Sequence, residues 1–91
     1  MRLQDAIYNW LQIKLVADAR PDDLAARETE QFFAEILTED HKAGDVRIAQ
    51  SDETKYYVEY VFEGEFVTRA FDREAADQLL SDIESNPKYN E

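Results

Sequence analysis

The chain has 91 residues, enough for one domain and too few for two, and its 21 acidic and 10 basic side chains give a net charge of −11. A surface of this charge repels phosphate backbones and anionic lipid headgroups, so we expect neither a nucleic-acid nor a membrane partner. The chain has no Cys, which excludes disulfides, thiolate metal sites and cysteine nucleophiles. No segment approaches the roughly 20 apolar residues that span a bilayer, and the N-terminus lacks an apolar export segment, so we expect a cytoplasmic protein.

The acidic residues are concentrated in two parts of the chain. Residues 21–45 contain eight acidic and two basic side chains, and residues 72–91 contain six acidic and two basic ones. Both parts are predicted to be largely helical, so their helices should form an acidic surface. Such a surface is compatible with a basic protein partner.

Residues 3–17 are predicted to form an amphipathic helix, because a stripe of residues recurs at steps of three and four. The stripe contains Leu3, Ile7, Trp10, Leu11, Lys14 and Leu15. Tyr8, Ile13 and Val16 widen its apolar part to more than half of the circumference. A helix this apolar usually lies between two packed elements or against a partner chain.

A second helix is predicted over residues 21–42. Pro21 suits the first position of a helix, and Asp22 and Asp23 then fall in the first turn, where the positive end of the helix dipole favours carboxylates. Lys42 in the last turn and Gly44 just beyond it form a C-terminal stop signal.

Three strands are predicted where apolar and polar residues alternate, over residues 46–51, 55–62 and 65–71. The connections between them are short, so the strands should form an antiparallel meander. This part of the chain defines the fold class more clearly than any other.

The turn at Glu63 and Gly64 leaves two pairings open for the second hairpin. A two-residue loop mixes apolar and polar residues on each face of the sheet, whereas a G1 bulge with Gly64 in the left-handed conformation keeps them apart. The bulge is therefore predicted. It pairs Tyr60 with Phe66, Val58 with Thr68, and Tyr56 with Ala70.

The sheet face turned away from the helices is predicted to be an interaction face. Its residues are Arg47, Tyr57, Glu59, Val61, Val67 and Arg69. A face exposed only to water would be more polar than this one. Either the N-terminal helix covers part of it or another chain does.

A third helix should begin after Asp72, whose side chain can cap it, and extend to residue 84. Residues 85–91 then form a polar C-terminal tail. The prediction is one α+β domain over residues 1–91, ordered α-α-β-β-β-α, with a three-stranded antiparallel meander packed against helices. Its predicted core is Ile7, Trp10, Leu11, Leu24, Phe32, Phe33, Ile36, Val46, Ile48, Tyr56, Val58, Tyr60, Phe66, Leu79, Leu80 and Ile83.

Chemistry-bearing patterns are weak in this sequence. His41 is the only His, and a position near a helix C-terminus explains it, because its charged form is favoured by the dipole there. Catalytic zinc commonly needs three protein ligands, and no Asp-rich calcium loop is present. The two Gly residues form no phosphate-binding loop, and no nucleophile elbow occurs. We therefore predict no catalytic residue, metal or cofactor, and no enzymatic activity.

The function predicted from sequence is a small acidic, non-enzymatic protein-interaction or regulatory module. Its partner is another protein or a second copy of the chain. One alternative is an acidic inhibitor or immunity-type protein that imitates a nucleic-acid backbone. Another is a small-ligand-binding protein or enzyme with a pocket between helices and sheet, bounded by Trp10, Tyr60 and either His41 or Glu59.

Overall fold

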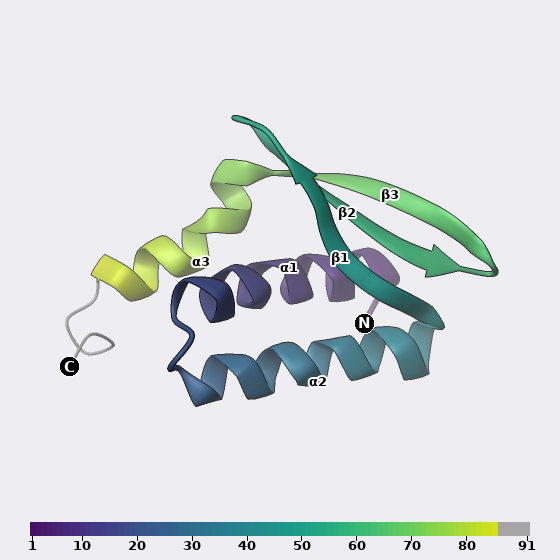
Figure 1. The fold of residues 1–91 in the computed structure, drawn as a ribbon, viewed down its shortest axis with the longest axis horizontal. Coiled ribbons are helices and arrows are strands. Elements are labelled where there is room, and N and C mark those ends of the chain that lie inside the picture. The colour runs from purple at the N-terminus through teal and green to yellow at the C-terminus, as the bar shows by residue number, and fades with distance from the viewer. Residues whose placement is uncertain (86–91) are drawn as a thin grey trace.

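The computed structural model describes residues 1–85 and confirms the element order α-α-β-β-β-α (Figure 1). The helices are α1 (Leu3–Ala19), α2 (Leu24–His41) and α3 (Arg73–Ser85), and the strands are β1 (Ala43–Ser51), β2 (Lys55–Phe62) and β3 (Glu65–Asp72). The tail predicted after residue 84 lies outside the described residues, apart from Ser85. Within residues 1–85, no helix has both the length and the apolar character needed to cross a bilayer.

The first helix, α1, lies beneath the sheet and contacts both α2 and α3 (Figure 1). Ala6, Ile7 and Leu11 are completely buried, and Trp10 is nearly so. The broad apolar surface predicted for this helix is thus covered by the chain itself on several sides. A partner chain is not needed to explain it.

The second helix begins at Leu24, so the prediction that it starts at Pro21 is wrong. Asp23 is its N-cap, and a carboxylate oxygen of Asp23 accepts a hydrogen bond from the backbone N–H of Ala26 at 3.1 Å. An Asp outside the helix can satisfy an N–H that has no helical partner, which an Asp in the first turn does less well. At the other end, the residue in the left-handed conformation is Lys42, with φ of 57°. The sequence had indicated Gly44 as the stop signal of this helix.

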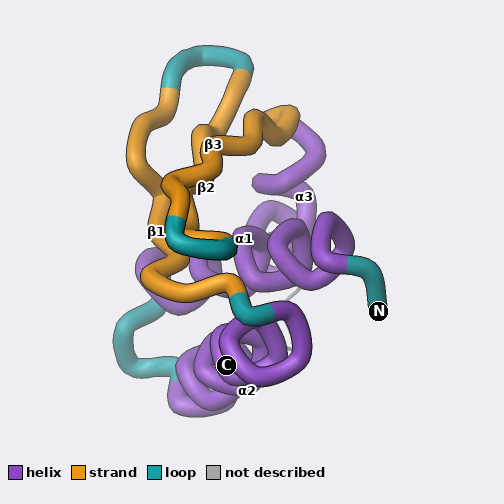
Figure 2. The backbone as a smooth tube through the Cα atoms, turned by 90° about the vertical axis from the view of Figure 1, so that its right-hand side faces the viewer, coloured by secondary structure: helices purple, strands orange, loops and turns teal. Residues whose placement is uncertain are grey.

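The sheet has the order β1-β2-β3, with both pairs antiparallel (Figure 2). Strand β1 begins three residues before the predicted start at residue 46, and its pairing with β2 is irregular at two places. Asp45 lies in the first irregularity with φ of 51°. In contrast, β2 and β3 pair without interruption over their whole lengths.

The second hairpin has a two-residue turn, so the predicted G1 bulge is wrong. Glu63 and Gly64 have φ of 53° and 79°, and Phe62 is paired with Glu65. Two consecutive residues with positive φ give the turn a twist that matches the right-handed twist of the strands. The resulting register places Tyr60 opposite Val67, Val58 opposite Arg69, and Tyr56 opposite Phe71.

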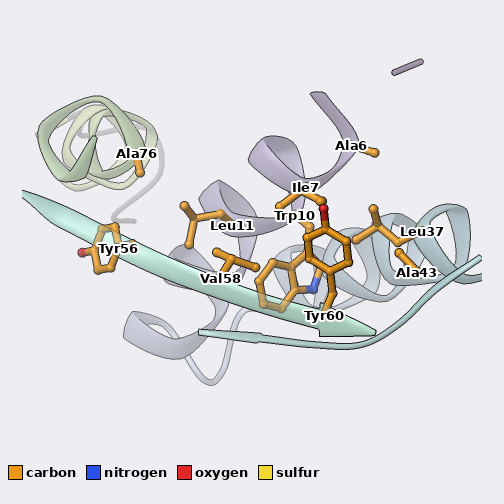
Figure 3. Close-up of a cluster of buried hydrophobic side chains, with 10 residues drawn as sticks. All are labelled: Ala6, Ile7, Trp10, Leu11, Leu37, Ala43, Tyr56, Val58, Tyr60 and Ala76. Carbon is orange, nitrogen blue, oxygen red and sulfur yellow. The ribbon is translucent and has the colours of Figure 1, made fainter. Parts of the chain in front are cut away.

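The main core lies between α1 and the sheet side that carries Tyr56, Val58 and Tyr60, which we call the inner face (Figure 3). Predicted core residues that are buried are Ile7, Trp10, Leu11, Tyr56, Val58 and Tyr60. Others are half-buried and pack against the buried clusters: Phe33, Ile36, Val46, Ile48, Leu79, Leu80 and Ile83.

Three predicted core residues are exposed instead. The exposed fractions are 68% for Leu24, 57% for Phe32 and 75% for Phe66. Leu24 and Phe32 lie on the exposed side of α2. Phe66 is exposed because the two-residue turn places it opposite Val61, on the outer side of the sheet.

The third helix is capped as predicted, since Asp72 accepts a hydrogen bond from the backbone N–H of Ala75 at 2.9 Å. Ala76 is completely buried in the main core. A second cluster, formed by Val16, Ala17 and Ala26 with apolar residues of α3, joins the three helices. The last helix is thereby held to both α1 and the sheet.

Candidate interaction surface

The sheet side that points away from the helices is the outer face. Side chains alternate along a strand, so the burial of Tyr56, Val58 and Tyr60 places the residues between them on this face. From β2 it contains Lys55, Tyr57, Glu59 and Val61, and opposite them on β3 lie Asp72, Ala70, Thr68 and Phe66. Arg47 of β1 lies opposite Glu59.

The structure brings four of the six predicted interaction residues together on the outer face: Arg47, Tyr57, Glu59 and Val61. Val67 and Arg69 lie on the inner side of β3, opposite Tyr60 and Val58. The expected diagonal between Glu59 and Arg69 is therefore absent, because it depended on the bulged register. The basic partner of Glu59 is Arg47 instead, whose guanidinium donates a hydrogen bond to Glu59 at 2.8 Å.

Phe66 is the outer-face residue that sequence reasoning missed. It was placed in the core by the bulged register, yet it is 75% exposed and lies opposite the half-buried Val61. The signal that could have located it is the turn, since two residues ending in Gly between alternating strands favour a two-residue hairpin loop. Tyr57, Val61 and Phe66 together give this face its apolar character.

Among the paired strand residues of the outer face that carry a charge, the charges balance. Arg47 and Lys55 are basic, Glu59 and Asp72 are acidic, and Lys55 is directly opposite Asp72 in the register. In a chain with a net charge of −11, this is a locally neutral surface. An apolar patch within neutral surroundings can approach another protein without strong electrostatic repulsion.

Asp52, in the turn between β1 and β2, stabilises the end of the outer face that lies next to this turn. Its carboxylate accepts hydrogen bonds from the backbone N–H groups of Thr54 and Lys55 at 2.9 and 2.7 Å, and from the Tyr57 hydroxyl at 3.1 Å. The two backbone hydrogen bonds hold the pKa of Asp52 below its usual value. The same carboxylate raises the pKa of Tyr57, so the phenol stays neutral and remains a donor.

A second polar cluster joins α3 to the inner face. The Tyr56 hydroxyl donates to Asp77 at 2.6 Å, and the Arg73 guanidinium lies 5.0 Å from the centre of the Tyr56 ring. Arg73 also donates to the carbonyl of Asp52 at 2.8 Å. Burial, followed by the hydrogen bond to Asp77, raises the pKa of Tyr56, so this phenol is a donor and not a base. The cluster has the properties of a structural clamp.

Two hollows on the described surface are lined by residues other than those expected for an enzyme pocket. One of about 450 Å³ lies between α1 and α2, where Lys14 forms ion pairs with Asp18 and Glu30 at 3.1 and 3.8 Å. Another of about 540 Å³ lies beside the clamp. Trp10 and Tyr60, which were expected to bound a pocket, are both buried and lie close together in the core (Figure 3).

No group of three or more potential metal-ligating side chains occurs among residues 1–85. His41 ends α2 and is half-buried there. Within the same residues, no polar or charged side chain is fully buried.

A second surface runs along the exposed side of α2, and we call it the acidic stripe. Its residues recur at steps of three and four: Leu24, Glu28, Phe32, Glu35 and Glu39. All of them are exposed. The stripe thus combines three carboxylates with two large apolar side chains.

Comparisons with known proteins find no family model, no curated protein and no solved structure that matches this chain. Function must therefore be inferred from the chain's own surfaces, of which the outer face and the acidic stripe are the most distinctive.

Proposed function

We propose that this chain is a small, acidic, non-enzymatic protein-interaction module that binds through the outer face of its sheet. The observation that carries the proposal is Phe66, a large aromatic side chain that is 75% exposed on a well-formed strand. Burying such a side chain stabilises by about 2 kcal/mol, which folding of the monomer does not gain. A partner that covers Phe66 would gain it.

The surroundings of Phe66 support a protein partner. Val61 is directly opposite, and Tyr57 lies further along β2 on the same face. Aromatic residues at the centre of a patch with charged residues around them are typical of protein interfaces. The Arg47–Glu59 ion pair, at 2.8 Å, lies at one side of the patch and gives it a polar rim.

The non-enzymatic part of the proposal is supported by the state of the polar groups. The Tyr56 and Tyr57 phenols each donate to a carboxylate, and the pKa of each is raised, by burial first for Tyr56 and by the hydrogen bond to Asp52 first for Tyr57. A general base or nucleophile needs the opposite shift. We place the module in the cytoplasm, where a chain without Cys loses nothing to the reducing conditions.

The test compares two Phe→Ser substitutions on different surfaces. Phe66→Ser should abolish retention of the proteins that the immobilised wild-type chain captures from its native cytosol, copies of the chain included. Phe32→Ser removes an equally large exposed ring from α2 and should retain them. Both variants should melt within a few degrees of the wild type, since neither ring is buried. Equal retention by wild type and Phe66→Ser would overturn the proposal.

The acidic stripe on α2 favours a second candidate function, an inhibitor that imitates a nucleic-acid backbone and covers a basic protein surface. Glu28, Glu35 and Glu39 are exposed along one side of the helix, with Phe32 among them. Regularly spaced carboxylates can occupy a surface that binds phosphates. For this candidate, Phe32→Ser is the damaging variant and Phe66→Ser the harmless one.

A further inference from the structure

Strand β3 has an open edge that is suited to pairing with another strand. Its neighbour in the sheet is β2 on one side, and the order β1-β2-β3 leaves its other side without a strand. Proteins usually protect such edges with proline, bulges, very short strands, a covering helix or charged side chains, and of these β3 has the charged residues Glu65 and Arg69. The other edge strand, β1, has two irregularities, whereas β3 is eight residues long, has no bulge against β2 and contains no Pro.

The half of β3 nearest the hairpin turn is the accessible part of this edge. In Figure 1, α3 follows the Asp72 end of the strand and extends sideways beyond the sheet, whereas the Glu65 end lies at the tip of the hairpin. Residues 65, 66, 68 and 69 are exposed, and Val67 between them is half-buried. This segment can accept a strand without displacing a helix.

We propose that the occupant of this edge is a second copy of the chain, paired antiparallel through residues 65–69 about a two-fold axis at Val67. In this register Glu65 of each copy lies opposite Arg69 of the other, Val67 lies opposite itself, and Phe66 lies opposite Thr68. The two three-stranded sheets then form one continuous sheet. The proposal rests on the proposed function, because it names the partner of the same surface.

Charge complementarity within the strand favours this register, because a shift of two residues toward the turn places Arg69 opposite Glu63, which lies outside β3, and leaves Glu65 opposite Val67. Opposite residues in an antiparallel pair point to the same face of the sheet. If the pairing were shifted by one residue, the inner-face residues of one copy would lie opposite outer-face residues of the other. A shift of two residues toward the C-terminus places Glu65 opposite Phe71 and Arg69 opposite Val67, which leaves both charges without an ionic partner. The register about Val67 pairs each charge with its opposite, twice, by symmetry.

The same register also covers Phe66. The two Phe66 rings lie on the outer face at diagonal positions across the axis, which is within reach for aromatic side chains. Each ring would thus lose part of its 75% exposure to the other copy. The segment that pairs has one acidic and one basic residue and is therefore neutral, although each chain carries a charge of −11.

The decisive experiment is a charge swap, followed by sedimentation velocity of the full chain over a concentration series. Glu65→Arg and Arg69→Glu should each raise the dimer dissociation constant at least tenfold, because each variant places like charges opposite each other twice. The double variant should recover the wild-type constant to within about threefold. A mixture of the two single variants should form a 1:1 heterodimer.

Matched controls carry the same changes in charge away from the edge. Glu53→Arg in the β1–β2 turn and Arg27→Glu on α2 are both exposed and should change the dissociation constant by less than about threefold, through the net charge alone. Circular dichroism checks that each variant is folded. A wild-type chain that stays monomeric at millimolar concentration would overturn the proposal, as would single swaps that dimerise like the controls.

A cross-linking measurement gives an independent readout, because the chain has no Cys of its own. Antiparallel partners have Cα atoms about 4.5 to 5.5 Å apart, within the range of a disulfide. Val67→Cys should therefore oxidise to a covalent dimer faster than Ala70→Cys, which lies away from the axis. Equal rates would count against the register. If these tests fail while Phe66→Ser still abolishes capture of other proteins, the dimer is wrong and the interaction module stands.

Discussion

Glu63 holds a backbone conformation that its side chain does not favour. Its φ is 53°, in the left-handed region, and Gly64 follows with φ of 79°. Asn is tolerated in this region because its short side chain bonds to nearby backbone, and Asn-Gly is the preferred pair for such a turn. We expect Glu63→Asn to stabilise the protein by about 0.5 to 1 kcal/mol, or roughly 3 to 6 °C in melting temperature.

The control for this prediction is Glu63→Gln, which removes the same charge without favouring positive φ. Thermal unfolding of the three proteins separates the two effects. A gain that is equal for Asn and Gln would mean that charge, and not backbone conformation, limits the turn.

Asp52 makes the stability of the β1–β2 turn depend on pH. Hydrogen bonds from the N–H groups of Thr54 and Lys55 lower its pKa in the folded state below the ordinary value of 3.8. The stabilisation by the carboxylate is therefore complete above that value and is lost as the pH falls through the lower folded-state pKa. Asp52→Ala should reduce the free energy of unfolding at neutral pH, and the deficit should shrink below about pH 4.

Urea unfolding at a series of pH values measures this difference, with Asp52→Asn as the control. Asn keeps an oxygen for the two backbone donors but cannot ionise, so it should show a smaller deficit at neutral pH. A deficit for Asp52→Ala that is the same at neutral pH and at pH 3 would contradict the role assigned to the carboxylate.

At the scale of elements, the clamp between Tyr56 and α3 holds the last helix to the sheet. The Tyr56 hydroxyl donates to Asp77 at 2.6 Å, and Arg73 lies over the same ring. Tyr56→Phe keeps the ring and removes only the hydrogen bond, so we expect a loss of about 1 kcal/mol in the free energy of unfolding. Compared with the wild type, amide exchange in this variant should accelerate more in α3 than in α1.

Tyr57→Phe is the matched control for the clamp, because it removes a hydroxyl that donates to Asp52 from the exposed outer face. Its effect on stability should be smaller, and exchange in α3 should not change. An equal loss in both variants, with α3 unaffected in each, would show that the clamp does not attach the helix.

Element types could be predicted from this sequence because burial leaves a periodic signal. The alternation in β2 places Tyr56, Val58 and Tyr60 on one side, and the structure buries all three. Strand bounds for β2 match the prediction, and those for β3 differ by one residue. The order of elements followed from these periods and from the short connections.

The register of β3 could not be predicted by the same reasoning, because two local preferences conflicted. Separating apolar from polar residues favoured a bulge and a buried Phe66, whereas the turn residues favoured a two-residue loop. The turn determined the register, and this choice moved Val67 and Arg69 off the candidate surface and Phe66 onto it. The completely buried Ala6 and Ala43 were missed for a different reason, since Ala is common in both buried and exposed positions.

For the whole molecule, the net charge of −11 decides how salt should act on association. Two copies repel each other at long range, and the two Glu65–Arg69 contacts of the proposed dimer oppose this only locally. Exposed ion pairs are weak, and salt screens charges beyond about 10 Å at 0.1 M. We therefore expect the dimer to tighten by about threefold to tenfold between roughly 50 and 500 mM NaCl, as repulsion is screened.

The acidic stripe predicts the opposite sign, because a basic partner is attracted at long range and salt removes that attraction. Sedimentation equilibrium of the chain alone over the same salt range measures the first case, and titration with a polylysine probe measures the second. The double variant Glu28→Gln and Glu35→Gln lowers the negative charge on α2. It should therefore weaken the salt dependence of both self-association and polylysine binding. Self-association that weakens as salt rises would contradict the expected sign and would mean that the two Glu65–Arg69 contacts outweigh the net repulsion between copies.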